Sequence, residues 1–317
     1  MEDVLPFVSI CTPTFNRRPF IPLLKKCIEE QTYPLSKIEW IIADDGTDPI
    51  EDLITDISYC KYFRVEKMPL GKKRNFIHSK CSGSIIVNID DDDFYPPNRV
   101  EHAVDTILKN NVLIVGSSKM FMYFFNKDKV YQCGPYKDNH CTAATMAFKK
   151  ELLNVTSYPE DAYVAEETKF LKGYSIPMIQ LDPFKTILVF SHKHNSYDKD
   201  EMLNSLKQTD LTVSDFIKND ELKNLYMTEI PKQLDIYDNF GSSKNKTELS
   251  NYINTLKKQR FESKKQKIIE MIDSGDLSID DFITFMEKKK YYELNIENKN
   301  KMIKKLIEKI KGLEAKK

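Results

Sequence analysis

The sequence predicts an α/β protein with a mostly parallel central sheet flanked by helices. Short apolar runs of strand length alternate, over the first 200 residues, with amphipathic stretches of helical spacing. This alternation is typical of βαβ units. Three of the apolar runs end directly in polar or acidic clusters. Ligands of open α/β sheets bind beyond the carboxyl ends of the strands, so these clusters are the first candidates for a functional site.

Composition supports this class and excludes several others. The chain has 317 residues, of which 41% are hydrophobic and 30% charged, which excludes a disordered chain. Its 9 glycines exclude collagen-like and glycine-rich repeats. The six cysteines form no CxxC pair, and no apolar signal segment opens the chain. With apolar runs no longer than a strand, this predicts a cytoplasmic protein without a transmembrane segment.

The first strand–helix–strand unit covers residues 7–43. Residues 7–11 predict a buried strand, and the breaker cluster at 12–16 predicts a loop after it. Residues 18–31 have helical periodicity, with prolines in the first turn, where a missing N–H costs little. A second strand over 38–43 stops at Asp44-Asp45-Gly46-Thr47.

The next unit predicts a strand over 62–67, a helix over 71–81 and a strand over 84–89. That last strand runs into four consecutive aspartates, Asp90 to Asp93. If the strands are parallel, the clusters at 12–16, 44–48 and 90–93 meet at one edge of the sheet. The later elements are a helix over 99–110, strands over 113–115, 120–125, 130–133, 143–148 and 187–192, and a helix over 160–173.

The run of four aspartates is the clearest sign of chemistry. Carboxylates this close repel one another and raise one another's pKa unless a cation binds them. Mn²⁺ and Mg²⁺ prefer oxygen ligands and are often bound by one or two carboxylates together with substrate phosphates. The alternative is an acidic turn that caps the helix beginning near Pro96.

Five segments, in their order and spacing, resemble the family 2 glycosyltransferases of GT-A fold. They are residues 8–17, 31–34, 39–47, 71–75 and 90–99. The resemblance covers roughly the first 200 residues. It implies an inverting transferase that uses Mn²⁺ or Mg²⁺ to move a sugar from a nucleotide diphosphate donor, commonly a UDP-sugar, to a hydroxyl acceptor such as a glycan. The lack of a membrane span favours the addition of a single sugar over processive synthesis.

The resemblance also implies a nucleotide pocket. Backbone amides of one segment would line it, contributed by Thr12, Pro13, Thr14 and Asn16. Asp45 would accept the N3–H of uracil, which cytosine lacks, although a turn cap is the simpler role for this residue. Arg74 would contact the nucleoside or the diphosphate, whereas Lys72 and Lys73 are expected to be solvated.

Within the acidic run, the family's D-x-D motif aligns with Asp90 and Asp92. Asp92 would bind the metal directly, and Asp90 or Asp91 would face the ribose or the donor sugar, with Asp90 as a further candidate ligand. His192 and His194 end the last predicted strand, where alternation places both on one face, and either would complete the metal site or contact the diphosphate. Structural histidines are the more common case.

An inverting transfer needs a general base for the acceptor hydroxyl. The pair Glu166-Glu167 resembles the family's Glu-Asp pair, whose second residue is the base, so Glu167 is the first candidate and Glu166 the alternate. A solvated helix surface is the other interpretation of this pair. Residues 140–148 resemble the small-residue strand beneath the bound sugars.

Beyond residue 200 the chain becomes rich in Lys and Glu. We expect a catalytic domain over 1–200 and a helical region over 201–317, with a hinge at 240–247. Residues 241–317 carry 19 basic and 12 acidic side chains. The apolar spacing over 302–313 predicts packing on the catalytic domain, on a partner helix in a homo-oligomer, or on an anionic surface.

Two other functions stay open from the sequence. A catalytically silent module could bind a nucleotide sugar and assemble through the helical tail. A nucleotidyltransferase shares the fold class and metal, but the glycine-rich basic loop expected near its N-terminus is absent. No nucleic-acid signature occurs, because basic residues are not interleaved with aromatic ones.

Overall fold

A computed structural model describes residues 5–195 and 199–237, and part of the range 254–287. In that range the described residues are 254–255, 258–259, 261–262, 265–278, 281, 283–284 and 286–287. The chain divides into two compact units, residues 1–250 and 251–317. In the second unit, residues 265–273 are helical and the chain turns at Gly275, where φ is +77°. In the described parts of the chain, no helix has the length and apolar character needed to cross a membrane.

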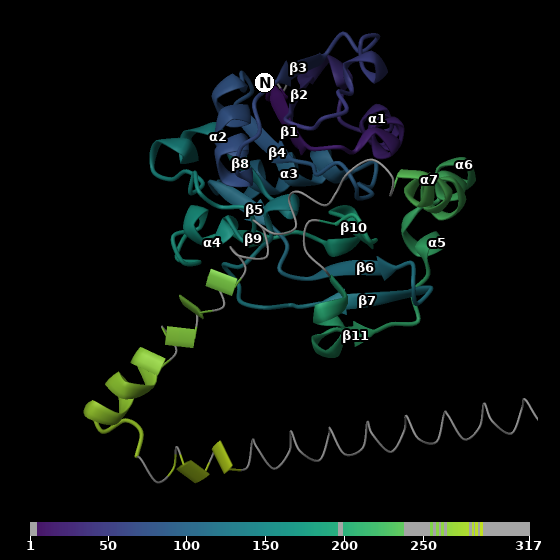
Figure 1. The fold of residues 1–317 in the computed structure, drawn as a ribbon. Coiled ribbons are helices and arrows are strands. Elements are labelled where there is room, and N and C mark those ends of the chain that lie inside the picture. The colour runs from purple at the N-terminus through teal and green to yellow at the C-terminus, as the bar shows by residue number, and fades with distance from the viewer. Residues whose placement is uncertain are drawn as a thin grey trace, which may run out of the picture. The chain divides into compact units, whose positions relative to one another are not determined.

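A seven-stranded sheet forms the centre of the first unit (Figure 1). Its strands, in spatial order, are β3 (Cys60–Arg64), β2 (Ile38–Asp44), β1 (Val8–Thr14), β4 (Ile85–Asn88), β8 (Ala147–Lys149), β5 (Ile114–Gly116) and β9 (Ile179–Gln180). All neighbouring pairs are parallel except those made by β8, which runs antiparallel to β4 and β5. The predicted α/β class with a mostly parallel central sheet is therefore confirmed.

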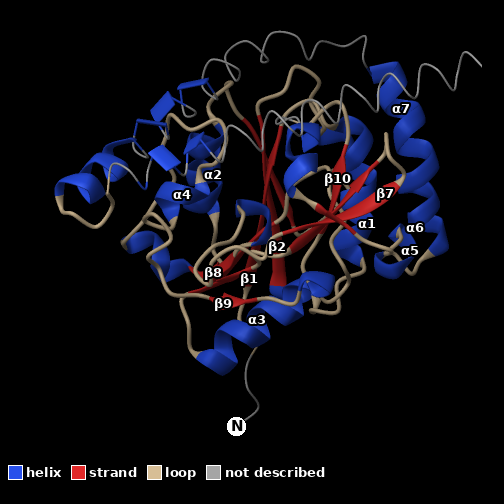
Figure 2. Cartoon of the chain, turned by 90° about the horizontal axis from the view of Figure 1, so that it is seen from below, coloured by secondary structure: helices blue, strands red, loops and turns tan. Residues whose placement is uncertain are grey.

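Helices cover both faces of this sheet, as Figure 2 shows. On one face, α1 (Ile21–Glu29) and α3 (Arg99–Asn110) pack on the strand residues Ile10, Ile42 and Val87. On the other face, Ile77 of α2 (Leu70–Lys80) packs with Ile41 and Ile86. Alternate residues of each strand thus face opposite cores, as the two-residue period of a strand requires.

A second, four-stranded sheet has the order β10 (Leu188–Ser191), β6 (Met120–Phe124), β7 (Lys129–Cys133) and β11 (Lys207–Gln208). The strands predicted over 120–125 and 130–133 are β6 and β7, which pair antiparallel as a hairpin. Phe94, directly after the acidic run, exchanges two backbone hydrogen bonds with Leu188, 2.9 and 3.0 Å long. These bonds bring the beginning of β10 to the acidic run.

Residues 199–237 belong to the first unit. Their helices are α5 (Val213–Phe216), α6 (Asp220–Asn224) and α7 (Ile230–Tyr237), and Phe216, Tyr226 and Ile230 are buried in the same core as α1 and α3. The division at 250/251 differs from the expected boundary at 200. The reason is that Lys and Glu occupy the exposed faces of short helices whose apolar faces pack inward. The expected hinge at 240–247 and helix at 302–313 lie outside the described residues.

Three local predictions differ from the structure. The loop expected at 12–16 is a strand as far as Thr14. Pro13 is tolerated there because its nitrogen, which has no hydrogen to donate, lies on the β4 side of β1, beyond the residues that pair with β4. The helix expected over 160–173 is reduced to α4 (Glu167–Phe170), since Ala165, Lys172 and Gly173 have φ of 56°, 50° and 69°. The strand expected over 143–148 begins as a 3₁₀ turn, Ala143–Thr145.

Short helical turns complete the connections. The 3₁₀ helices are Arg18–Phe20, Leu35–Lys37, Glu51–Leu53, Ala143–Thr145, Lys150–Asn154, Pro183–Lys185 and Lys199–Ser205, and Leu225–Glu229 is π-helical.

Candidate active site

The three polar clusters meet at the carboxyl edge of the central sheet. After β1, the Asn16 Oδ1 atom accepts hydrogen bonds from the backbone N–H groups of Thr47 (2.6 Å) and Asp48 (3.2 Å), which follow β2. The next residue, Arg17, lies 3.6 Å from Asp91 and 3.6 Å from Asp92, which follow β4. The predicted convergence of the three strand ends is therefore observed.

At the end of β2, each carboxylate is surrounded by its own donors. Asp44 is fully buried and accepts hydrogen bonds from the backbone N–H of Gly46 (2.8 Å) and the Tyr62 hydroxyl (2.8 Å). Asp45 forms a buried ion pair with Lys73 and accepts a 3.1 Å bond from the Met68 N–H. If Asp45 binds the nucleotide base, as expected from the sequence, it does so while paired with Lys73.

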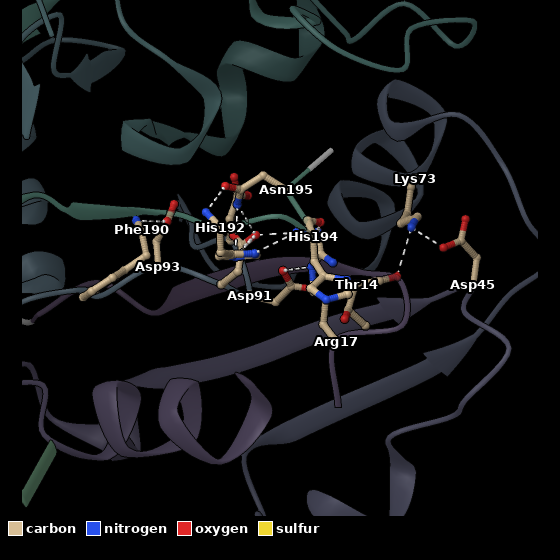
Figure 3. A network of polar contacts seen from close by, with 12 residues as sticks. Thr14, Arg17, Asp45, Lys73, Asp91, Asp93, Phe190, His192, His194 and Asn195 are labelled. Carbon is tan, nitrogen blue, oxygen red and sulfur yellow. Dashed lines mark hydrogen bonds and ion pairs between the residues drawn. The ribbon is translucent and has the colours of Figure 1, made fainter. Parts of the chain in front are cut away.

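Lys73 is buried rather than solvated, contrary to expectation. Its side chain is 6% exposed, and Nζ also donates to the Thr14 carbonyl at 3.0 Å (Figure 3). Burial lowers the pKa of Lys73 from its ordinary value, although the Asp45 charge opposes that shift. The Thr12 side chain lies in the core, where its hydroxyl accepts a 2.9 Å bond from Trp40 Nε1.

Arg74 connects the acidic run to the Glu166-Glu167 pair. Its Nη2 atom donates to Asp90 Oδ1 at 3.0 Å, and Nε donates to Glu166 Oε1 at 2.8 Å. Burial opposes the charge of Arg74, but Asp90 and Glu166 outweigh it and raise the Arg74 pKa. Within the described ranges, the buried Nη1 atom has no hydrogen-bond partner, so this guanidinium can donate one more bond.

Asp92 lies at the centre of the acidic run. Its Oδ2 atom is 3.3 Å from His192 Nε2 and accepts a 3.0 Å bond from Asn195 Nδ2. Burial raises the Asp92 pKa, but the hydrogen bond from His192 and the charge of Arg17 outweigh it and hold the pKa below its usual range. Asp92 is therefore ionised.

The two flanking aspartates behave differently. Burial and the charge of Asp92 raise the pKa of Asp91 to about 7. Asp93 is also raised, by burial first, but its carboxylate accepts a 2.9 Å bond from the Phe190 N–H and its carbonyl accepts from the Tyr226 hydroxyl. Asp93 thus anchors β10 and Tyr226 to the end of the acidic run.

Of the two candidate histidines, His192 contacts the acidic run through Asp92. The strand β10 ends at Ser191, so the alternation expected to place both histidines on one face does not reach them. His194 Nε2 lies 3.2 Å from the carbonyl of Leu234 in α7. The His192 ring is stacked on Phe20, with ring centroids 4.9 Å apart, and burial lowers its pKa to about 4.

The two glutamates have distinct surroundings. Glu166 is 4% exposed and paired with Arg74, whereas Glu167 is half-buried as the first residue of α4. Glu166 is therefore committed to holding the guanidinium. Glu167 keeps the exposure that a base for an incoming hydroxyl requires.

The donor set fits a divalent cation in part. In the described ranges, no three His, Cys, Asp or Glu side chains meet as a complete metal site. Asp92 Oδ2 and His192 Nε2 together offer an oxygen and a nitrogen donor at the end of β4. Such a pair suits Mn²⁺ or Mg²⁺ when the remaining positions are filled by diphosphate oxygens and water.

Three residues of this site were missed or undervalued from the sequence. Arg17 donates to the His194 carbonyl at 2.5 Å and lies against the acidic run. Asn195 bonds Asp92, and Lys73 bonds Asp45. Arg17 was within a motif segment and Asn195 stood beside the two histidines, so both positions gave a signal. Their partners, however, are distant in the sequence.

Comparison with known proteins agrees with this geometry. A family model described as glycosyl transferase family 2 matches residues 9–155. This part of the chain is therefore similar to the family 2 glycosyltransferases. Residues 9–155 contain β2, β4, the acidic run and all but the first residue of β1, so the matched range covers the carboxyl edge described above.

Two curated relatives of this chain are glycosyltransferases by name. Glycosyltransferase AglE of Haloferax volcanii is 29% identical over 138 residues, which are 39% of this chain and 42% of that protein. The GalNAc(5)-diNAcBac-PP-undecaprenol β-1,3-glucosyltransferase of Campylobacter jejuni is 25% identical over 193 residues, which are 54% and 60% of the two chains. The chain thus spans less than two thirds of either relative.

Solved structures were also matched. Staphylococcus aureus TarS 1–349 gives a TM-score of 0.48 at 20% identity and covers 58% of this chain and 60% of that one. The mannosyltransferase PcManGT of Pyrobaculum calidifontis, in complex with GDP-Man and Mn²⁺, gives 0.47 at 17% identity, with coverage of 80% and 81%.

Proposed function

We propose that this protein is a metal-dependent, inverting glycosyltransferase that moves a single sugar from a nucleotide diphosphate donor, most suitably a UDP-sugar, to a hydroxyl acceptor. The observation that carries the proposal is the acidic run at the end of β4. There, Asp91 and Asp92 lie beside Arg17 and Asp90 lies beside Arg74, within the segment that matches the family 2 model. This excess of negative charge suits a site that binds a divalent cation together with an anionic substrate.

The end of β2 supports a uridine donor. Asp45 lies in a buried pair with Lys73, close to the Thr14 carbonyl at the end of β1. A carboxylate oxygen accepts the N3–H of uracil, whereas cytosine presents an acceptor at N3. Lys73 would hold Asp45 in place for that contact. The backbone after β1, including Asn16, would form the opposite wall of the base pocket.

The diphosphate belongs at the acidic run. Asp92 and His192 would hold the metal ion, with Asp90 turned to the donor by its bond to Arg74. A divalent cation bound there supplies positive charge to the leaving diphosphate. The Nη1 atom of Arg74, which has no partner among the residues that the structure describes, is suited to donate to an oxygen of the nucleotide sugar at the same point.

Glu167 is the proposed base. It would take the proton of the acceptor hydroxyl as that oxygen attacks the anomeric carbon from the face opposite the diphosphate. Glu166, which precedes it, holds Arg74 and so fixes the beginning of α4 against the acidic run. One glutamate would then position the site, and the other would transfer the proton.

The test is thermal unfolding with UDP, GDP, CDP and TDP, each with Mn²⁺ and again with EDTA, followed by measurement of nucleotide release from UDP-sugars. A ligand at about 100 times its Kd stabilises the native state by roughly 2.7 kcal/mol. We expect stabilisation by UDP that requires Mn²⁺. Stabilisation by GDP alone would contradict the role of Asp45. Nucleotide binding without turnover of any UDP-sugar would indicate a silent binding module instead.

A further inference from the structure

Three aromatic side chains form a stack outside the residues assigned so far. The rings of Tyr136 and His140 have centroids 4.7 Å apart and are tilted by 51°. Those of His140 and Tyr174 are 4.6 Å apart and stacked, with an interplanar angle of 25°. We call Tyr136, His140 and Tyr174 the aromatic stack. Its residues come from two connections, one between β7 and β8 and one between α4 and β9.

The aromatic stack is open to solvent on its Tyr136 side. Tyr136 is 51% exposed, which is high for a large aromatic side chain, and the other two rings are half-buried. The hydroxyl groups of both tyrosines contact protein atoms: Tyr136 OH lies 3.1 Å from Cys133 Sγ, and Tyr174 OH lies 3.0 Å from Thr168 Oγ1. With both hydroxyls held in this way, ring surface is what the aromatic stack offers to a ligand.

The backbone beneath the aromatic stack is fixed to β9. Gln180 Nε2 donates to the carbonyls of Asp138 (2.5 Å) and His140 (3.0 Å), and the Met178 N–H donates to the Asn139 side chain at 3.4 Å. These three bonds hold the connection that carries Tyr136 and His140. The rings are therefore presented by an anchored surface, and little ordering is needed when a ligand binds.

The segment that follows His140 crosses the carboxyl edge of the sheet. Asn88, at the end of β4, donates to the Ala143 carbonyl at 3.0 Å. The Ser117 N–H, just after β5, donates to Thr145 Oγ1 at 3.0 Å. A Cβ atom at Gly116 would come within 2.6 Å of Cys141, so the absence of a side chain at Gly116 permits this close crossing. The segment thus runs from the aromatic stack to the strand that precedes the acidic run.

The other end of the aromatic stack touches α4. Thr168, whose hydroxyl contacts Tyr174, directly follows Glu167, and its carbonyl accepts a 2.8 Å bond from Gly173 N–H. Tyr174 therefore contacts the residue that directly follows Glu167, the proposed base. The aromatic stack therefore lies on the side of the site where the hydroxyl to be deprotonated must arrive.

The order of strands separates this surface from the donor. Across the sheet, the base pocket lies at β2 and β1, the acidic run at β4, and the segment that leads to the aromatic stack at β8 and β5. A donor that extends from Asp45 to Asp92 runs along the first part of this order. Its sugar then points toward the second part, where the acceptor has to approach.

We propose that Tyr136, His140 and Tyr174 form the platform that binds a saccharide unit of the acceptor. This inference rests on the proposed function and adds the acceptor class to it. A pyranose presents a face of C–H groups, which packs on aromatic surface, while its hydroxyl groups stay in water or reach the polar edges of the site. Tyrosine is well suited to this contact, because it offers a large rigid surface with only two rotatable side-chain bonds.

The experiment is saturation-transfer NMR on the full chain with UDP and Mn²⁺. The probes are the methyl glycosides of glucose, N-acetylglucosamine, galactose and mannose. Irradiation of the aromatic protons should transfer saturation to the C–H protons of at least one glycoside. Tyr136→Ala should weaken that binding about tenfold, the equivalent of one aromatic contact. Tyr136→Phe keeps the ring and should retain the signal.

A matched control is Phe7→Ala, which removes an aromatic residue that is 37% exposed at the amino end of β1. It should leave the glycoside signal unchanged. If UDP binds and no glycoside receives saturation, or if Tyr136→Ala keeps the full signal, the inference is overturned while the proposed function stands. Loss of UDP affinity in Tyr136→Ala would assign the aromatic stack to the donor and also overturn it. If the wild type binds no nucleotide, the proposed function itself fails.

Discussion

The ends of β2 and β4 carry similar acidic sequences but differ in how their charges are balanced. At the end of β2, Asp44 accepts bonds from Gly46 and Tyr62, and Asp45 pairs with Lys73. At the end of β4, four consecutive aspartates lie near Arg17, Arg74 and one histidine. The first cluster is internally satisfied, whereas the second has more carboxylates than cations.

The pKa values express the same difference. Burial and the charge of Asp92 raise the pKa of Asp91 to about 7. A cation bound nearby would favour the ionised form of Asp91, and the ionised oxygen would in turn stabilise the cation. The neighbouring Asp92 stays ionised because of His192 and Arg17. Two runs of acidic residues after two parallel strands can thus have separate roles: one shapes a pocket, and the other is suited to a metal ion and a diphosphate.

The largest expected effect comes from the glutamate pair joined to the end of β4 through Arg74. Glu167→Gln should lower kcat for sugar transfer by about 10²–10⁴, because the amide cannot take a proton. UDP affinity should not change. Glu166→Gln removes a buried charge beside Arg74, so it should reduce thermal stability as well as activity. Steady-state kinetics and UDP titration distinguish the two, and equal kcat losses without any stability change would contradict the division of roles.

The next effect contrasts the two strand ends directly. Asp92→Ala should reduce transfer by about 10²–10³, the typical cost of losing one stabilising group at a developing charge, and should abolish the Mn²⁺ requirement for UDP binding. Asp44→Asn, in the satisfied cluster, should lower the free energy of unfolding by about 1–3 kcal/mol and keep that requirement. Calorimetric titration of UDP with and without Mn²⁺ measures this. A Mn²⁺ requirement that survives in Asp92→Ala would rule out the metal assignment.

A third change tests whether Lys73 and Asp45 serve only to neutralise each other's charge. Lys73→Met leaves Asp45 buried without its cation and should cost about 3–5 kcal/mol of unfolding free energy. The double variant Lys73→Met with Asp45→Leu removes both charges and should recover most of that loss. Urea unfolding provides the measurement. If the double variant is as unstable as Lys73→Met, the pair stabilises the fold by more than the mutual neutralisation of its two charges.

The smallest effect concerns a group away from both clusters. His78 of α2 is buried among Phe148, Tyr158 and Phe170, and burial lowers its pKa to about 3. Below pH 6.5 the unfolded chain binds a proton that the folded chain does not, so stability falls as the pH is lowered toward 3. Between pH 7 and 5 the loss should be about 2 kcal/mol. His78→Phe should remove that part of the pH dependence in urea titrations, and an unchanged slope would contradict the pKa assignment.

Local pattern predicted the first half of the fold well. The strands β1 to β4 and the helices α1 to α3 overlap the expected segments, although β1 extends to Thr14 and β3 begins earlier and ends earlier than expected. The pattern failed over 160–173, where positive φ values interrupt the helix, and over 199–237, where short helices of charged composition pack into the main core. In both regions, tertiary contacts override weak local preference.

The sequence by itself determined the order of strands and helices along the chain. It also determined that the acidic residues, and the other residues able to carry chemistry, gather at the carboxyl edge of the sheet. The tertiary structure alone decided the partners. It paired Lys73 with Asp45, brought His192 to Asp92, and stacked Tyr136, His140 and Tyr174. The physical reason is that periodicity records which face of an element is buried. Ion pairs and ring contacts depend instead on distances between segments that are remote along the chain.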